Sequence, residues 1–190
     1  MPASIVCAKA GVTTGEWGAA LRAVFGEYRA PTGVDTGASS DEPELATVKA
    51  AVAVATKRLG RAPRFLMGKP GLDGHSNGAE QIAVRARDAG MDVTYQGIRQ
   101  TPDEIVQVAR DMKADIIGLS ILSGSHVPLV RDVTARLRVE GLDIPVVVGG
   151  IIPPDDENVL KNMGVAAVYT PKDYSLDGII GDMAGLIGRK

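Results

Sequence analysis

The residues best suited to chemistry are Asp73 and His75, which stand two positions apart in a glycine-rich stretch, residues 69–80. A carboxylate that holds one ring nitrogen of a histidine leaves the other nitrogen as an oriented metal ligand. One histidine is too few for a zinc site, which uses three or four protein ligands. It instead suits a metal that is already held in a macrocycle and has one axial position free. The pair therefore indicates axial ligation by His75.

The segments on either side of this stretch indicate where it lies in a fold. A short apolar run at 64–67 predicts a strand, and an amphipathic pattern at 79–89 predicts a helix. The stretch then forms a strand-to-helix loop at the carboxyl edge of a sheet, where open α/β folds bind their ligands. Its glycines allow the backbone to approach a large, flat ligand closely.

The rest of the chain alternates strands and helices in the same way. Such a rhythm with short loops predicts an α/β fold, a doubly wound five-stranded parallel sheet of Rossmann or flavodoxin type. Strand order 2-1-3-4-5 would bring the loop with Asp73 and the loop with Ser120 to one crevice. The further predicted strands are 91–95, 115–120, 144–148 and 165–169, and the further predicted helices are 101–113, 127–140 and 176–187.

Residues 1–60 have a different character and are predicted to be a helical extension that precedes a sheet domain at 61–190. An aromatic and aliphatic stripe at helical spacing indicates one helix, a Pro-, Gly- and Ser-rich linker follows at 32–43, and a second helix is expected at 44–59. The stripe packs either on its own domain or on a partner surface. We favour the partner, because a short helix beyond a linker cannot bury its face alone. The stripe consists of Trp17, Leu21, Val24, Phe25 and Tyr28.

Composition excludes several classes of function. The net charge is −2 and the pI is about 5.7, so a nucleic-acid or polybasic membrane surface is not expected. The chain contains no apolar run of roughly 18 residues and does not open on a signal peptide. The single cysteine, Cys7, excludes an internal disulfide and agrees with a reducing cytoplasm, which is the expected location.

Three motifs together resemble the cobalamin-binding signature of adenosylcobalamin-dependent mutases and of methionine synthase. They are Asp73-x-His75-x-x-Gly78, Ser120-Ile121-Leu122 after the third strand, and Gly149-Gly150 after the fourth. The resemblance is greatest to the cobalamin domains of acyl-CoA mutases. Ser76-Asn77 and the segment 169–173 are more similar to ethylmalonyl-CoA mutase than to methylmalonyl-CoA mutase.

The resemblance implies a role for each matching residue. Cobalamin would bind with its nucleotide tail detached from cobalt, His75 would be the lower axial ligand, and Asp73 would hold the other ring nitrogen. Ser120 would hydrogen-bond the benzimidazole of the tail, and Leu122 would pack on it. Glycines at 78, 149 and 150 would make room for the tail, and Tyr169 and Thr170 would close its far side. The predicted cofactor-binding set also includes Gly74, Ser76, Asn77, Gly78, Ile82, Gly118, Gly124, Gly149, Gly150 and Ile151. His126 and the acids at 155–157 are interpreted only as helix-start residues.

The implied reaction is a radical carbon-skeleton rearrangement of an acyl-CoA. A catalytic barrel needs about 200 residues or more, so the substrate half must be a separate subunit or domain, and no catalytic residue is expected in this chain. The chain is either a natural small subunit or a C-terminal piece of a longer mutase. Further implied partners are a G-protein chaperone, an adenosyltransferase and a second copy of the chain.

Three alternatives remain open. The chain could be a methylmalonyl-CoA mutase small subunit. It could be a corrinoid methyl carrier, although such carriers have a four-helix cap for which residues 1–60 are too short. It could be a non-catalytic module such as a cobalamin sensor or a receiver. A receiver needs a phosphorylatable Asp after its third strand, and this strand ends in Ser120.

Overall fold

A computed structural model describes residues 2–26, 43–173 and 175–188, and within these ranges five parallel strands form one sheet in the order β2-β1-β3-β4-β5. The predicted doubly wound sheet and its strand order are therefore confirmed. The central strand β3 is buried along its whole length, as its unbroken apolar sequence indicates. The strands are β1 (Arg64–Gly68), β2 (Asp92–Tyr95), β3 (Ile116–Ser120), β4 (Val146–Gly149) and β5 (Ala167–Tyr169).

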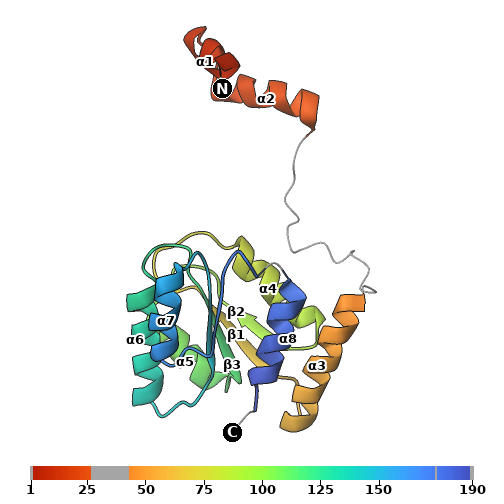
Figure 1. The fold of residues 1–190 in the computed structure, drawn as a ribbon, viewed down its shortest axis with the longest axis vertical. Coiled ribbons are helices and arrows are strands. Elements are labelled where there is room, and N and C mark those ends of the chain that lie inside the picture. Colours follow the sequence, from red (N-terminus) through yellow and green to blue (C-terminus); the bar gives the residue numbers. More distant parts are fainter. Residues whose placement is uncertain (1, 27–42, 174, 189–190) are drawn as a thin grey trace. The chain divides into compact units, whose positions relative to one another are not determined.

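Helices cover both faces of the sheet (Figure 1). One face carries α5, α6 and α7, and the other carries α3, α4 and α8. A hydrophobic cluster fills each interface, so the sheet separates two cores. The helices are α3 (Pro43–Leu59), α4 (Asn77–Asp88), α5 (Pro102–Asp111), α6 (His126–Val139), α7 (Pro154–Asn162) and α8 (Leu176–Leu186).

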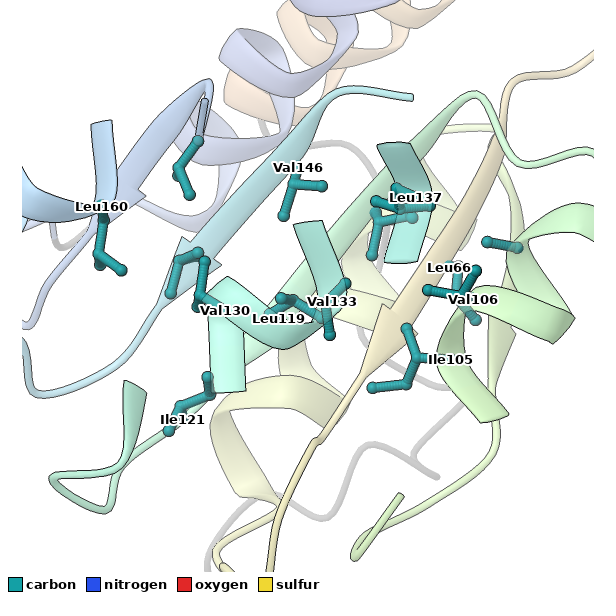
Figure 2. Packing of buried hydrophobic residues seen from close by; sticks show 14 of the residues in the cluster. Leu66, Ile105, Val106, Leu119, Ile121, Val130, Val133, Leu137, Val146 and Leu160 are labelled. Atoms are coloured by element: carbon teal, nitrogen blue, oxygen red, sulfur yellow. The ribbon is translucent and has the colours of Figure 1, made fainter. Parts of the chain in front are cut away.

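Figure 2 shows the core beneath α5 and α6. Leu66 of β1 and Leu119 of β3 point from the sheet toward Ile105 and Val106 of α5 and Val133 of α6, and all of these residues are buried. Burying one such side chain contributes roughly 1.5–3 kcal/mol to folding. This packing fixes the strand ends from which the functional loops emerge.

Some element bounds differ from the sequence-based ones. The fourth and fifth strands begin two residues later than predicted, at Val146 and Ala167, and the helix predicted to reach residue 113 ends at Asp111. The acids at 155–157, predicted as first-turn charges, open the full helix α7. The helix α1 (Pro2–Lys9) was not predicted, because its sequence has no amphipathic period.

Contacts divide the chain into two compact units, residues 1–37 and 38–190. The first unit contains α1 and α2 (Thr14–Phe25), and neither helix has a buried residue among those described. The helix predicted at 44–59 was assigned to the N-terminal extension, but as α3 it packs on α8 and buries Leu45, Val48 and Val52. Tyr28 and most of the predicted linker lie outside the described residues. In the described ranges, no helix is long and apolar enough to span a membrane.

Candidate functional site

The loop after β1 and the loop after β3 meet at the carboxyl edge of the sheet, at the point where the strand order reverses. Asp73 joins them: its Oδ2 accepts a hydrogen bond from the Leu122 backbone N–H at 2.9 Å, and its Oδ1 accepts one from the His75 N–H at 3.0 Å. The Asp73 side chain is only 4% exposed. The buried carboxylate of Asp73 therefore bonds to both of the loops that flank the predicted crevice.

The same carboxylate orients the ring of His75. The Nδ1 atom of His75 lies 2.7 Å from Asp73 Oδ1, while the His75 side chain is 79% exposed. An ionised Asp73 only accepts hydrogen bonds, so Nδ1 carries the ring proton and donates it. The lone pair of Nε2 is then free and directed away from the carboxylate. This is the geometry of a histidine prepared to bind a metal.

Lys69, which the sequence analysis did not single out, completes this group. Its side chain is 1% exposed, and its Nζ donates to the Ser120 carbonyl oxygen at 3.2 Å and lies 3.5 Å from Asp73 Oδ2. A buried ammonium needs such partners because its desolvation is costly. A lysine directly after an apolar strand was the available signal, since that position points to burial near the strand end.

The surroundings of Asp73 keep it ionised. Burial alone would raise its pKa, but hydrogen bonds from the backbone and ring of His75 and from the Leu122 N–H, together with the charge of Lys69, outweigh burial. These interactions hold the pKa of Asp73 well below its ordinary range. The carboxylate is therefore a permanent acceptor at neutral pH.

Gln100 holds the start of this loop in register with the sheet. Its side-chain Oε1 accepts from the Lys69 N–H at 2.8 Å, its own N–H donates to the Lys69 carbonyl at 3.0 Å, and its carbonyl accepts from the Gly71 N–H at 2.9 Å. Gln100 is buried and was not predicted as a site residue. These bonds with Lys69 and Gly71 extend the β1–β2 pairing beyond the strands and fix where Lys69 enters the crevice.

A cavity of about 310 Å³ opens beside these loops, between the sheet and helices α4 and α8. Its walls are almost wholly apolar, with Phe65 and Met67 of β1 and Ile179 and Met183 of α8 among them. The predicted site residues that line it are Gly78, Ile82, Gly118, Ser120, Leu122, Gly149, Gly150, Ile151, Tyr169 and Thr170. The other predicted residues, Asp73, Gly74, His75, Ser76, Asn77 and Gly124, lie outside its lining.

Glycines shape this cavity in two different ways. A Cβ atom at Gly78 or Gly149 would meet no atom within 4 Å, so both positions face open space. A Cβ at Gly150 would lie 1.8 Å from the Ile121 carbonyl oxygen, so the loop after β4 reaches the loop after β3 only because residue 150 has no side chain. Gly150 is thus required by the packing of the protein itself.

Tyr169, at the end of β5, places a polar atom in this apolar region. Its hydroxyl is buried and has no hydrogen-bond partner among the described residues. Burial, reinforced by the charges of Asp182 and Asp173, raises the pKa of Tyr169 to about 12. The hydroxyl therefore stays protonated at neutral pH.

A macrocyclic metal fits these residues better than a bare ion. Among the described residues, no group of three or more His, Cys, Asp or Glu side chains could hold a metal. The exposed Nε2 of His75 offers one nitrogen ligand, so the remaining ligands must come from another molecule. The apolar cavity beside it is suited to an aromatic group of that molecule.

The chain is similar in sequence to known proteins along its whole length. Residues 63–180 match the B12 binding domain family. The chain is 64% identical over 195 residues to ethylmalonyl-CoA mutase from Methylorubrum extorquens and 60% identical over 189 residues to that from Cereibacter sphaeroides, each alignment covering 100% of the chain. It is 38% identical over 182 residues to methylmalonyl-CoA mutase from Rhizobium meliloti, covering 93% of the chain. It spans only 28%, 29% and 26% of the length of these relatives.

Two solved structures share the fold. A cobalamin-binding protein from Desulfitobacterium hafniense superposes with a TM-score of 0.59 at 21% identity, covering 76% of this chain and 70% of that one. A monomethylamine corrinoid protein from Methanosarcina barkeri superposes with a TM-score of 0.54 at 17% identity, covering 72% of this chain and 63% of that one. At these identities the likeness concerns the architecture alone.

Proposed function

This chain belongs to the B12-binding domain family, and we propose that it binds adenosylcobalamin with the nucleotide tail detached from cobalt and with His75 as the lower axial ligand. The observation that carries the proposal is the 2.7 Å contact between His75 Nδ1 and Asp73 on an otherwise exposed ring. That contact fixes both the tautomer and the direction of the ligating nitrogen.

The cavity is the place we assign to the nucleotide tail. Its apolar lining suits a benzimidazole ring, and Leu122 and Ile82 can pack on the faces of that ring. Ser120 supplies a polar group that such a ligand needs for orientation, and Tyr169 and Thr170 close the far side of the cavity. Gly78 and Gly149 leave room along two of its walls.

We further propose that the chain is the cofactor-binding part of a radical acyl-CoA mutase of the ethylmalonyl-CoA type. When bound, adenosylcobalamin supplies radical chemistry through its cobalt–carbon bond. The residues of this chain would hold and orient the cofactor. His75 would ligate cobalt, Asp73 would keep a proton on Nδ1, and the hydrogen bonds from His75 and Leu122, with the charge of Lys69, would keep Asp73 ionised. The high identity to two ethylmalonyl-CoA mutases supports this assignment.

The acyl-CoA substrate is assigned to a catalytic barrel outside this chain, because the chain spans about a quarter of its relatives' length. We assign the exposed face of α2 to contact with that barrel. Phe25 and Val24 are largely exposed on this face, with Trp17 and Leu21 beside them. We also propose that an adenosyltransferase and a G-protein chaperone load the cofactor and that the chain self-associates. We propose a cytoplasmic location because Cys7 is a free thiol.

The test is a visible absorption titration of the chain with adenosylcobalamin, beside a His75→Ala variant. We expect stoichiometric binding and a histidine-ligated spectrum for the wild type, and loss of that spectrum in the variant. The folding stability should change by only about 0.5 kcal/mol, because the side chain is exposed. Labelling histidine with ¹⁵N and recording the electron paramagnetic resonance of the cobalt(II) form identifies the axial nitrogen as protein or cofactor.

Two results would contradict parts of the proposal. A spectrum of free cofactor at every ratio, also after addition of a mutase barrel, would exclude cobalamin binding. Binding with an axial signal that ¹⁵N-histidine leaves unchanged would preserve the cofactor assignment and exclude His75 as the ligand.

A further inference from the structure

A buried histidine outside the Asp73–His75 pair joins two helices, α6 and α7, whose preceding loops line the cavity. His126 is the first residue of α6 and is only 2% exposed. Its Nε2 lies 2.8 Å from Oδ2 of Asp156, which is in the first turn of α7. The two helices pack side by side (Figure 1). The contact thus connects elements that are far apart in the sequence.

The position of this contact relates it to the cavity. The loop before α6 carries Leu122, and the loop before α7 carries Gly150 and Ile151, all of which line the cavity. At their strand ends the two loops are joined by the Ile121 N–H, which donates to the Gly149 carbonyl at 2.9 Å. At their helix ends they are joined by His126 and Asp156. The two loops are therefore tied together at both ends.

Neither α6 nor α7 has a side-chain cap that would fix the start of the helix locally. The residues before α6 and α7, Ser125 and Pro153, make no side-chain capping hydrogen bond. In α5, by contrast, Thr101 and Glu104 cap the helix start reciprocally. The starts of α6 and α7 are instead held by the contact between His126 and Asp156. Each of the two preceding loops is therefore positioned by the other.

The contact is poorly explained as a contribution to stability alone. Nδ1 of His126 is buried and has no hydrogen-bond partner among the described residues. An unpaired buried polar atom lowers the stability of the folded state, and an apolar side chain would avoid this cost. Buried polar pairs of this kind can instead select one arrangement of the elements that they join.

We propose that His126 and Asp156 form a latch that holds the two loops at the spacing required by the nucleotide tail of cobalamin. This inference rests on the proposed function, because it concerns the tail cavity. His126 and Asp156 are positioning residues: they act through Leu122, Gly150 and Ile151 and need not touch the cofactor.

The test compares the Kd of adenosylcobalamin with that of adenosylcobinamide, which has the same corrin ring but no nucleotide tail. The variants are His126→Phe, which keeps a ring without nitrogens, and Asp156→Ala. We expect each to weaken cobalamin binding about tenfold, the effect of one lost buried hydrogen bond, and to leave cobinamide binding unchanged. The second variant serves if the first fails to fold.

Two controls separate this role from general destabilisation. Glu157→Ala removes a neighbouring first-turn carboxylate that contacts Lys161 on the same helix, and the preference for cobalamin should stay at the wild-type value. His126→Gln can place a donor near the Nε2 position and should restore most of that preference.

Equal weakening of both ligands, or no weakening despite a lower Tm, would overturn the latch. A wild-type chain that binds cobalamin no better than cobinamide would overturn the tail cavity itself, and this result is visible before any variant is made.

Discussion

The loop after β1 and the cavity beside it, which we propose to form one cofactor site, are built in opposite ways. In the loop, Lys69, Asp73 and His75 are connected by hydrogen bonds and charge, and one ring edge is left exposed. In the cavity, the walls are apolar and positions 78 and 149 have no side chain. A metal ligand must point in one direction, which hydrogen bonds provide. A ring-shaped tail needs space, which the absence of side chains provides.

Because of this difference, we expect substitutions in the two regions to differ in how much they change folding stability and how much they change cobalamin binding. The largest effect is expected where the cavity wall and the protein's own packing coincide. Gly150→Ala would force a Cβ onto the Ile121 carbonyl and should lower the free energy of unfolding by about 3 kcal/mol, measured by urea denaturation. The control Gly149→Ala has free space for its Cβ and should change stability by about 0.5 kcal/mol or less, yet weaken cobalamin binding. Equal destabilisation by both variants would contradict this account.

The next effect is expected in the loop. Asp73→Asn leaves Lys69 without its counter-charge and should cost about 2 kcal/mol at pH 7, as well as altering the axial-ligand spectrum. The native pKa of Asp73 is depressed, so its contribution is fully present above the unfolded value of about 3.9 and is lost as the pH falls further. The stability difference between wild type and variant should therefore be constant from pH 7 to about pH 5 and narrow below about pH 4.

Urea denaturation across this pH range provides the measurement, and Asp92→Asn provides the control because Asp92 is exposed. A wild-type advantage that persists unchanged into strong acid would show that the charge of Asp73 is not its source.

The smallest change in folding stability is expected for Gly78→Ala, in which stability and cobalamin binding should change in opposite directions. Gly78→Ala, near the start of α4, should raise the free energy of unfolding by about 0.5 kcal/mol through better helix propensity. It should nevertheless weaken cobalamin binding, because the new methyl group faces the cavity. Gly181→Ala in α8 is the matched control: its Cβ also meets no atom within 4 Å, but it does not line the cavity. If the Gly78→Ala variant binds cobalamin with unchanged affinity, the cavity is not the binding site of the nucleotide tail.

For α2 and α5, the local sequence was sufficient to predict the helix but not its burial. Thr13 with Glu16 and Thr101 with Glu104 form the same capping box, and each begins a regular helix. Helix α5 buries Ile105, Val106 and Ala109, whereas α2 buries none of its described residues. A cap and a helical period depend on a few neighbouring residues, but burial depends on the surface that the helix meets.

The same division applies to the site. The sequence alone identified the Asp73–His75 pair and the strand ends that carry Ser120 and Gly149, because these are short motifs with their own chemistry. Only the tertiary structure revealed that Asp73 accepts from Leu122, that Lys69 donates to Ser120, and that His126 contacts Asp156. These pairs are 49, 51 and 30 residues apart. They form because the strand order brings distant loops to one edge of the sheet, and no local pattern of residues encodes that proximity.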